Sequence, residues 1–119
     1  MVKKTFTYTD FNGKERTEDA YFNINKAELL EMNMGDSRSV GVLAKGVREF
    51  ILTAYGEKSL DGRRFEKKDG ELAKAWAETP MFEMLYEELT SNEAAAIEFV
   101  KGVVPADVAQ NLTGIRFSN

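Results

Sequence analysis

Large aromatic residues alternate with threonines over residues 4–9, the period expected of a half-buried strand. Asn12-Gly13 follows, a dipeptide that favours the positive φ angles of a type I′ turn. In the return segment, Ala20 and Phe22 share one face. The pattern predicts a β-hairpin over about residues 4–22. Because an isolated hairpin is only marginally stable in water, this one needs a second layer to pack on.

The hydrophobic period then changes from two to between three and four. Asn25 has the position and chemistry of a helix N-cap, and Glu28 completes a capping box with it. The first helix is predicted from Lys26 to about Met34, with Gly35 ending it. Asp36 and Ser37 can cap a second, central helix that Gly56 ends. Its apolar stripe consists of Val40, Leu43, Val47, Phe50, Ile51, Ala54 and Tyr55.

A polar segment from Glu57 to Lys68 separates the central helix from the helices that follow. It contains the turn signal Asp61-Gly62, and Phe65 is expected to anchor it to the core. Three short helices are predicted after it, over about 70–78, from Thr79-Pro80 to about Thr90, and from Ser91 or Asn92 to Gly102. Their expected inward positions are Leu72, Ala75 and Trp76, then Phe82, Leu85, Tyr86 and Leu89, then Ala95, Ala96, Phe99 and Val100.

One hairpin followed by four to five short helices predicts an α+β fold in which helices cover one face of a small sheet. We expect a single domain over residues 1–111, with the hairpin at about 4–22 and the helices at about 26–111. Val104 precedes a proline and is expected to be extended, and Pro105 begins a last helical turn through Asn111. Residues 112–119 are predicted to form a flexible C-terminal tail.

The 119 residues include neither histidine nor cysteine. Histidine is the usual general base and a common metal ligand, and cysteine is the usual thiolate nucleophile. The many carboxylates fall mostly on the polar sides of amphipathic helices, where solvation explains them. These features predict a protein that is not an enzyme, with no cofactor and no metal site.

Charge and hydropathy narrow the class of partner. The net charge is −4, which disfavours binding to nucleic acid. Phe65, next to the basic residues Arg63 and Arg64, is the one aromatic candidate for stacking a single-stranded base. The preferred interpretation of this segment is a charge-balanced loop that Phe65 anchors to the core. The N-terminal segment has two lysines but no following apolar run, so a signal peptide is not expected. No stretch approaches the ~18 apolar residues that span a bilayer, so no membrane partner is predicted.

Six large apolar residues cluster within eleven positions on two consecutive predicted helices: Trp76, Met81, Phe82, Met84, Leu85 and Tyr86. Exposed Met and aromatic side chains adapt well to partner surfaces, so this group is the candidate protein-binding surface. Core packing is the competing interpretation, and it is favoured by a narrow margin.

Three segments together resemble the tail assembly chaperones of long-tailed phages of Gram-positive bacteria. They are residues 3–13, residues 54–67 and residues 99–107, so the similarity covers most of the chain. The most specific part is a turn composed of Tyr55, Gly56, Asp61, Gly62, Arg63, Arg64 and Phe65. The chain departs from the family's pattern after Met34, because its segment before the central helix is shorter.

The resemblance implies a chaperone that binds and solubilises the tape measure protein before the tail tube polymerises around it. It implies the short form of a frameshift pair, located in the cytoplasm of the infected bacterial host and missing from the mature virion. Implied partners are the tape measure protein, with the tail tube protein, the frameshifted long form and a second copy of the chain as further possibilities. The alternatives are a structural virion protein, such as a tail tube or tail completion protein, and a small single-stranded nucleic-acid-binding regulator.

Overall fold

The computed structural model describes residues 1–32 and 40–107. Strands β1 (Val2–Thr9) and β2 (Glu15–Phe22) form the predicted hairpin, with Phe6 opposite Glu18 and Tyr8 opposite Arg16. The described helices are α1 (Lys26–Met32), α2 (Val40–Ala54), α3 (Glu71–Ala77), α4 (Pro80–Ser91) and α5 (Glu93–Val103). The predicted α+β class is therefore confirmed.

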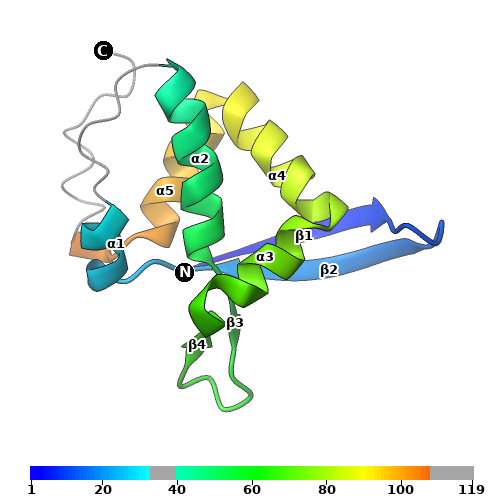
Figure 1. The fold of residues 1–119 in the computed structure, drawn as a ribbon, viewed down its shortest axis with the longest axis horizontal. Coiled ribbons are helices and arrows are strands. Elements are labelled where there is room, and N and C mark those ends of the chain that lie inside the picture. The colour runs from blue at the N-terminus through cyan, green and yellow to red at the C-terminus, as the bar shows by residue number, and fades with distance from the viewer. Residues whose placement is uncertain (33–39, 108–119) are drawn as a thin grey trace.

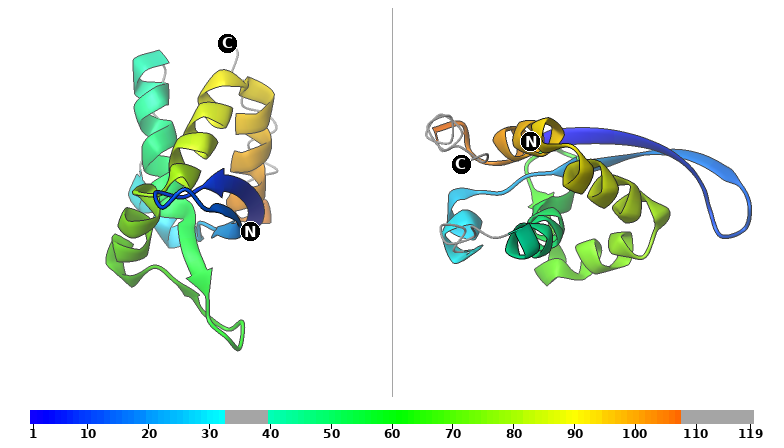
Figure 2. Two further views of the ribbon diagram at one scale, coloured as in Figure 1. Left: turned by 90° about the vertical axis from the view of Figure 1, so that its right-hand side faces the viewer. Right: turned by 90° about the horizontal axis from the view of Figure 1, so that it is seen from above.

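The helices and the sheet form two layers. Helices α2, α4 and α5 stand on one side of the β1–β2 ribbon, and the distal half of this ribbon extends beyond them (Figures 1 and 2). Alternate β1 residues, Phe6 among them, point toward the helices, while the threonines between them are exposed. The ribbon therefore buries only its proximal half, and its turn projects from the body.

The sheet has two more strands than the sequence pattern predicted. Helix α2 ends at Ala54, and β3 (Tyr55–Lys58) and β4 (Phe65–Glu66) form a second hairpin where a polar loop was expected. Tyr55, assigned to the helical stripe, instead pairs with Phe22 in the sheet order β1-β2-β3-β4. A β-carbon on Gly56 would lie 2.5 Å from the Phe65 ring, so this glycine permits the close approach of β4.

The predicted helix boundaries hold where side chains cap them. Asn25 and Glu28 exchange hydrogen bonds of 2.8 and 3.0 Å in a capping box. Thr79 caps α4 with Pro80 at its first position, and Asn92 caps α5. Two details were wrong: Ala73, not Ala75, is buried on α3, and α5 continues through Gly102 to Val103. The expected caps at 35–37 and the turn through Asn111 reach outside the described residues.

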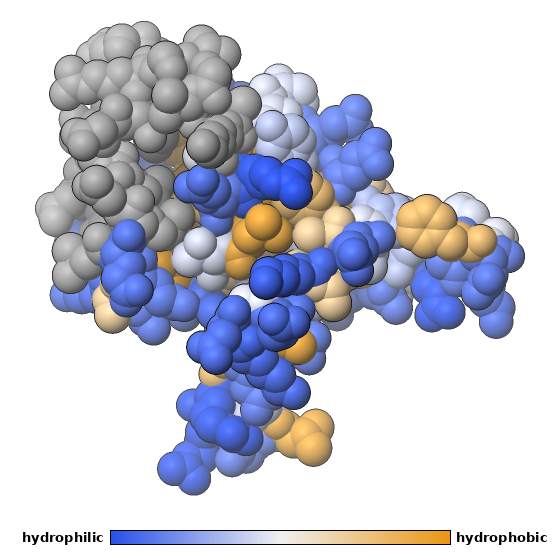
Figure 3. All heavy atoms as spheres, in the orientation of Figure 1, coloured by the Kyte–Doolittle hydropathy of each residue, from blue (hydrophilic) through white to orange (hydrophobic). Residues whose placement is uncertain are grey.

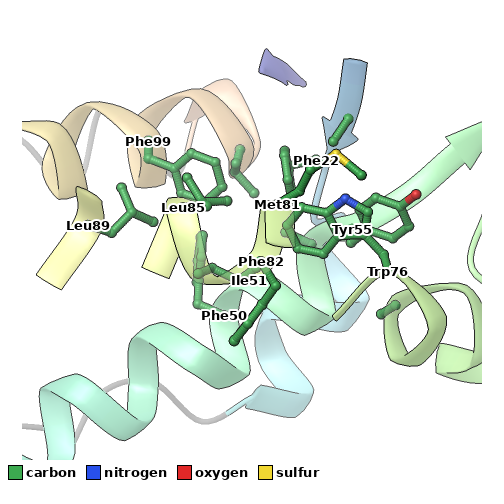
Figure 4. Close-up of a cluster of buried hydrophobic side chains, with 14 of the residues drawn as sticks. Phe22, Phe50, Ile51, Tyr55, Trp76, Met81, Phe82, Leu85, Leu89 and Phe99 are labelled. Atoms are coloured by element: carbon green, nitrogen blue, oxygen red, sulfur yellow. The ribbon is translucent and has the colours of Figure 1, made fainter. Parts of the chain in front are cut away.

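Trp76 packs against several aromatic side chains of the core (Figure 4). Its ring stacks on Tyr55 with centroids 4.7 Å apart and meets Phe22 and Phe82 edge-on at 5.4 and 6.0 Å. Phe6 completes the surround at 6.3 Å. One side chain of α3 therefore joins three strands to α4.

Lys67 ties the second hairpin to the helices. Its ammonium donates to the backbone carbonyls of Asn23 and Thr53, at 2.8 and 2.5 Å, and to the carboxylate of Glu28 at 2.7 Å. The side chain is only 19% exposed. Charge-assisted hydrogen bonds to three separate segments fix the path of the chain between β4 and α3.

Two glycines offer a matched test of this packing. Gly46→Ala within α2 should stabilise the fold by about 0.5–1 kcal/mol, because nothing lies within 4 Å of the new methyl group. Gly56→Ala should destabilise it by about 1–3 kcal/mol, because Phe65 and the Glu66 carbonyl must move. Urea denaturation measures both. A neutral Gly56→Ala would contradict the close β3–β4 approach.

Candidate functional site

An aspartate orders the turn of the first hairpin and thereby presents Phe11. The Asp10 side chain accepts hydrogen bonds from the backbone N–H groups of Asn12 and Lys14, both 2.9 Å, and from Arg16 Nε at 2.6 Å. The Arg16 bond, followed by those backbone bonds, lowers the pKa of Asp10 below its ordinary value. The ring of Phe11 stays 86% exposed at the tip.

The predicted type I′ turn is wrong. The N–H of Gly13 donates to the Asp10 carbonyl, and the N–H of Asp10 donates to the Lys14 carbonyl. Gly13 has a φ of 80°, but Asn12 is not among the residues with positive φ. A type I′ turn needs two such residues, whereas a three-residue loop closed by one left-handed glycine needs one. The extra residue in the loop is Phe11.

The corner between α3 and α4 faces this turn. The Thr79 hydroxyl accepts from the Met81 N–H and donates to the Trp76 carbonyl, so one side chain ends α3 and starts α4. Pro80 fixes the first position of α4. The capping residue of this corner is therefore bonded to both helices.

An open groove of about 420 Å³ lies between the hairpin turn and the helix corner. Its volume is in the range of small binding pockets. Most of the lining residues are apolar or aromatic, Phe82 and Tyr86 among them. The complete lining is Phe11, Ala77, Glu78, Thr79, Pro80, Phe82, Glu83 and Tyr86.

Carboxylates border this apolar groove. Glu78 and Glu83 are both exposed, and neither forms an ion pair with any residue that the structure describes. The guanidinium of Arg48 lies 5.1 Å above the Phe82 ring, where it makes a cation–π contact from α2. The groove thus combines an aromatic lining with an anionic edge.

The structure separates the six predicted partner-binding residues into two groups. Trp76, Met81, Phe82 and Leu85 are buried, with at most 9% exposure, so they build the core. Tyr86 is half-buried and lines the groove. Met84 is 39% exposed on α4 but is not part of the groove lining. Their contact with a partner stays a prediction.

The turn that carries the family resemblance is a second projecting tip. Asp61 accepts from the Ser59 hydroxyl at 2.6 Å and from the Arg63 N–H at 3.1 Å, and Gly62 has a φ of 76°. This arrangement leaves Leu60 fully exposed, while Phe65 is half-buried. Apolar surface is visible on both projecting tips in Figure 3.

Tyr55 links this turn to the core and stays protonated across the physiological range. Burial, followed by the nearby Glu57 carboxylate, raises its pKa to about 12. Its hydroxyl donates to Glu57 Oε2 at 3.5 Å.

Within residues 1–32 and 40–107 there is no group of three or more acidic residues placed to hold a metal ion. No helix in those ranges is long and apolar enough to span a bilayer.

A comparison with protein families places the chain. Residues 1–114 match the family model described as phage tail assembly chaperone. The chain belongs to the phage tail assembly chaperone family. The resemblance found in the sequence is thereby confirmed at the level of the family, and this tail assembly chaperone has a role in protein assembly with protein partners. It matches no curated protein and no solved structure.

Sequence reasoning about this chaperone overlooked Phe11 and the acidic edge. Phe11 lies between the alternating pattern of residues 4–9 and the turn dipeptide Asn12-Gly13, so no periodic pattern indicates whether its side chain is exposed. An available signal was the aspartate before it, because Asp favours the first position of a type I turn. Glu78 and Glu83 flank the capping residue Thr79, but nothing in their spacing places them against the hairpin.

Asp10→Ala tests whether this side chain orders the turn. The amide protons of Asn12 and Lys14 should exchange roughly three- to tenfold faster, because both lose their acceptor. Folding lowers the pKa of Asp10, so the ionised carboxylate stabilises the turn. The turn should therefore stay ordered above the ordinary Asp pKa of 3.8, and its order should be lost as the pH falls below that value. NMR hydrogen exchange measures the amide rates.

The second hairpin supplies the control for that experiment. Asp61→Ala removes the acceptor of the Arg63 N–H and should accelerate amide exchange only in the β3–β4 turn. If Asp10→Ala left exchange at Asn12 and Lys14 unchanged, the turn would be ordered by its backbone alone.

Proposed function

We propose that this tail assembly chaperone binds the tape measure protein and keeps it soluble until the tail tube polymerises around it. The tape measure is bound through its apolar helical segments. The chaperone acts in the cytoplasm of the infected host, a bacterium of the Gram-positive class carrying a long-tailed phage, and leaves before the virion is complete. The chain is the short form of a frameshift pair whose long form shares the same groove.

The observation that supports the proposal is the open groove with Phe11 at its edge. A helix that lays its apolar face into a groove buries side chains at three- and four-residue spacing. Phe11 is 86% exposed and is available to close over such a segment. Burying a large apolar side chain contributes about 1.5–3 kcal/mol, so a few anchors suffice for a reversible complex.

The geometry also favours release over permanent attachment. Four of the six apolar residues predicted to bind a partner are committed to the core. Among the residues that the structure describes, the exposed large apolar side chains are Met1, Phe11, Leu60 and Met84, so the apolar area offered to a partner there is small. Small interfaces of this kind are typical of transient complexes. Contacts with the tail tube protein or a second copy would use the same few surfaces.

The nucleic-acid alternative finds less support than the chaperone function. Phe65, the aromatic residue next to Arg63-Arg64, is half-buried, with its ring close to Gly56. Base stacking needs an exposed aromatic face. The groove, in contrast, offers an exposed aromatic ring with an anionic border that repels phosphate.

Phe11→Asp is the variant that tests the groove. Co-expressed with tape measure fragments, the variant should bind them roughly 10- to 100-fold more weakly than the unchanged chaperone. The reason is that an apolar ring buried in the complex is replaced by a charged side chain. The measurements are the soluble yield of the fragment and the dissociation constant of the purified pair. Phe11 is outside the core, so the variant should fold normally.

Leu60→Asp is the matched control. Leu60 is exposed and apolar and does not line the groove, so this variant should bind tape measure fragments as the unchanged chain does. Met84→Asp tests the exposed member of the predicted partner-binding group, which lies outside the groove. If Leu60→Asp or Met84→Asp abolished binding while Phe11→Asp did not, the partner would use another surface. If the unchanged chain solubilised no fragment, the proposed function itself would be wrong.

Departure from the finished particle is a separate prediction. Mass spectrometry of purified virions should detect the tail tube and tape measure proteins but not this chain, while infected-cell lysates should contain it. Its recovery from virions in stoichiometric amount would support the structural-protein alternative instead.

A further inference from the structure

We infer that the groove selects amphipathic segments whose apolar anchors are flanked by lysine or arginine. This inference rests on the proposed function and specifies the chemistry of its partner. The groove joins two kinds of surface, an aromatic lining that includes Phe11, Phe82 and Tyr86, and an edge that carries Glu78 and Glu83. A segment that fills it must satisfy both.

The acidic edge is part of a wider charge asymmetry. Between residues 71 and 103 the chain has seven glutamates and two lysines, although the net charge of the whole chain is only −4. Two of these carboxylates have an ion-pair partner in the described part of the chain. Glu88 pairs with Lys4 of β1 at 3.0 Å, and Glu71 pairs with Lys74 at 3.8 Å. Glu78 and Glu83 have no such neutralisation from the described part of the chain.

Covering these carboxylates constrains the occupant. A docked segment removes water from the groove edge, and a carboxylate that loses water without gaining a partner is costly. A lysine or arginine beside the apolar anchors offsets that cost, because it donates a charge-assisted hydrogen bond to the carboxylate. Arg48 does not fill this role for the groove edge, because its guanidinium is placed over the Phe82 ring.

Another copy of the chain is the competing occupant. The β3–β4 tip has the same chemistry as the expected ligand, an exposed Leu60 with exposed Arg63 and Arg64 close by. In its own molecule this tip projects away from the groove, on the opposite side of the ribbon from α4 (Figures 1 and 2). Occupation by this tip would therefore join two copies, and it predicts self-association that Leu60→Asp removes.

The test uses two synthetic 18-residue helical peptides with the same leucine face. One has lysines on the polar face and the other has glutamates, and both carry a fluorescent label. Anisotropy with the full chain should show the lysine peptide binding at least tenfold more tightly in 50 mM salt, and that preference should shrink in 500 mM salt. Equal affinity of the two peptides would overturn the inference.

The double variant Glu78→Gln/Glu83→Gln identifies the groove edge as the source of the preference. It should bind the lysine peptide roughly 3- to 10-fold more weakly, since exposed charge pairs are individually weak. Glu87→Gln/Glu98→Gln makes the same change in net charge at exposed positions outside the groove and should leave the affinity unchanged. Equal losses in both double variants would assign the preference to net charge and overturn the inference.

Two further measurements separate this inference from the proposed function and from self-association. If the unchanged chain solubilises tape measure fragments and Glu78→Gln/Glu83→Gln does so equally well, only the charge selectivity is wrong. If sedimentation shows a dimer or larger species that Leu60→Asp dissociates, and that variant binds the lysine peptide more tightly, the groove's occupant is another copy and the inference is overturned.

Discussion

Tyr55 and Trp76 stack face to face with centroids 4.7 Å apart, at the point where the sheet meets α3. Because Trp76 also meets Phe6, Phe22 and Phe82, its position fixes three strands and α4 at once. The indole Nε1 is buried and has no hydrogen-bond partner among the described residues, which costs about 1–3 kcal/mol. Four aromatic contacts of about 0.5–1.5 kcal/mol each, together with the buried area, offset that cost. The second hairpin and the helix corner are both attached to this stack.

The groove is a consequence of that core. Phe82 meets Trp76 edge-on, and Arg48 lies over its ring, so the residue connects the interior to the lining. Thr79, three residues after Trp76, fixes the angle between α3 and α4 and hence the wall that faces the hairpin turn. The opposite edge is Phe11, which is held by the local bonds of Asp10 and depends little on the core. One side of the groove is therefore built on the core, and the other is a projecting turn.

Sequence patterns predicted the elements that local chemistry determines. The first hairpin follows from alternation, and the helix starts at Asn25, Thr79 and Asn92 follow from capping, which acts over three residues. The β3–β4 hairpin escaped prediction because β4 has two residues and no alternation to detect. Its existence depends on Gly56 and on Lys67, whose three acceptors belong to segments up to 44 residues away. Such contacts leave no periodic signal.

The candidate site was predictable only in part, for the same reason. Apolar density drew attention to α4, but it cannot distinguish Leu85, which is fully buried, from Tyr86, which is half-buried and lines the groove. Helical period alone places both inward. Exposure is decided by what packs opposite each residue, and here the opposing element is a hairpin turn more than 60 positions earlier in the chain. A surface made where two turns meet contains residues that shape those turns. Thr79 and Pro80 form the helix corner and also line the groove, whereas Phe11 lines it from the three-residue loop that Asp10 orders.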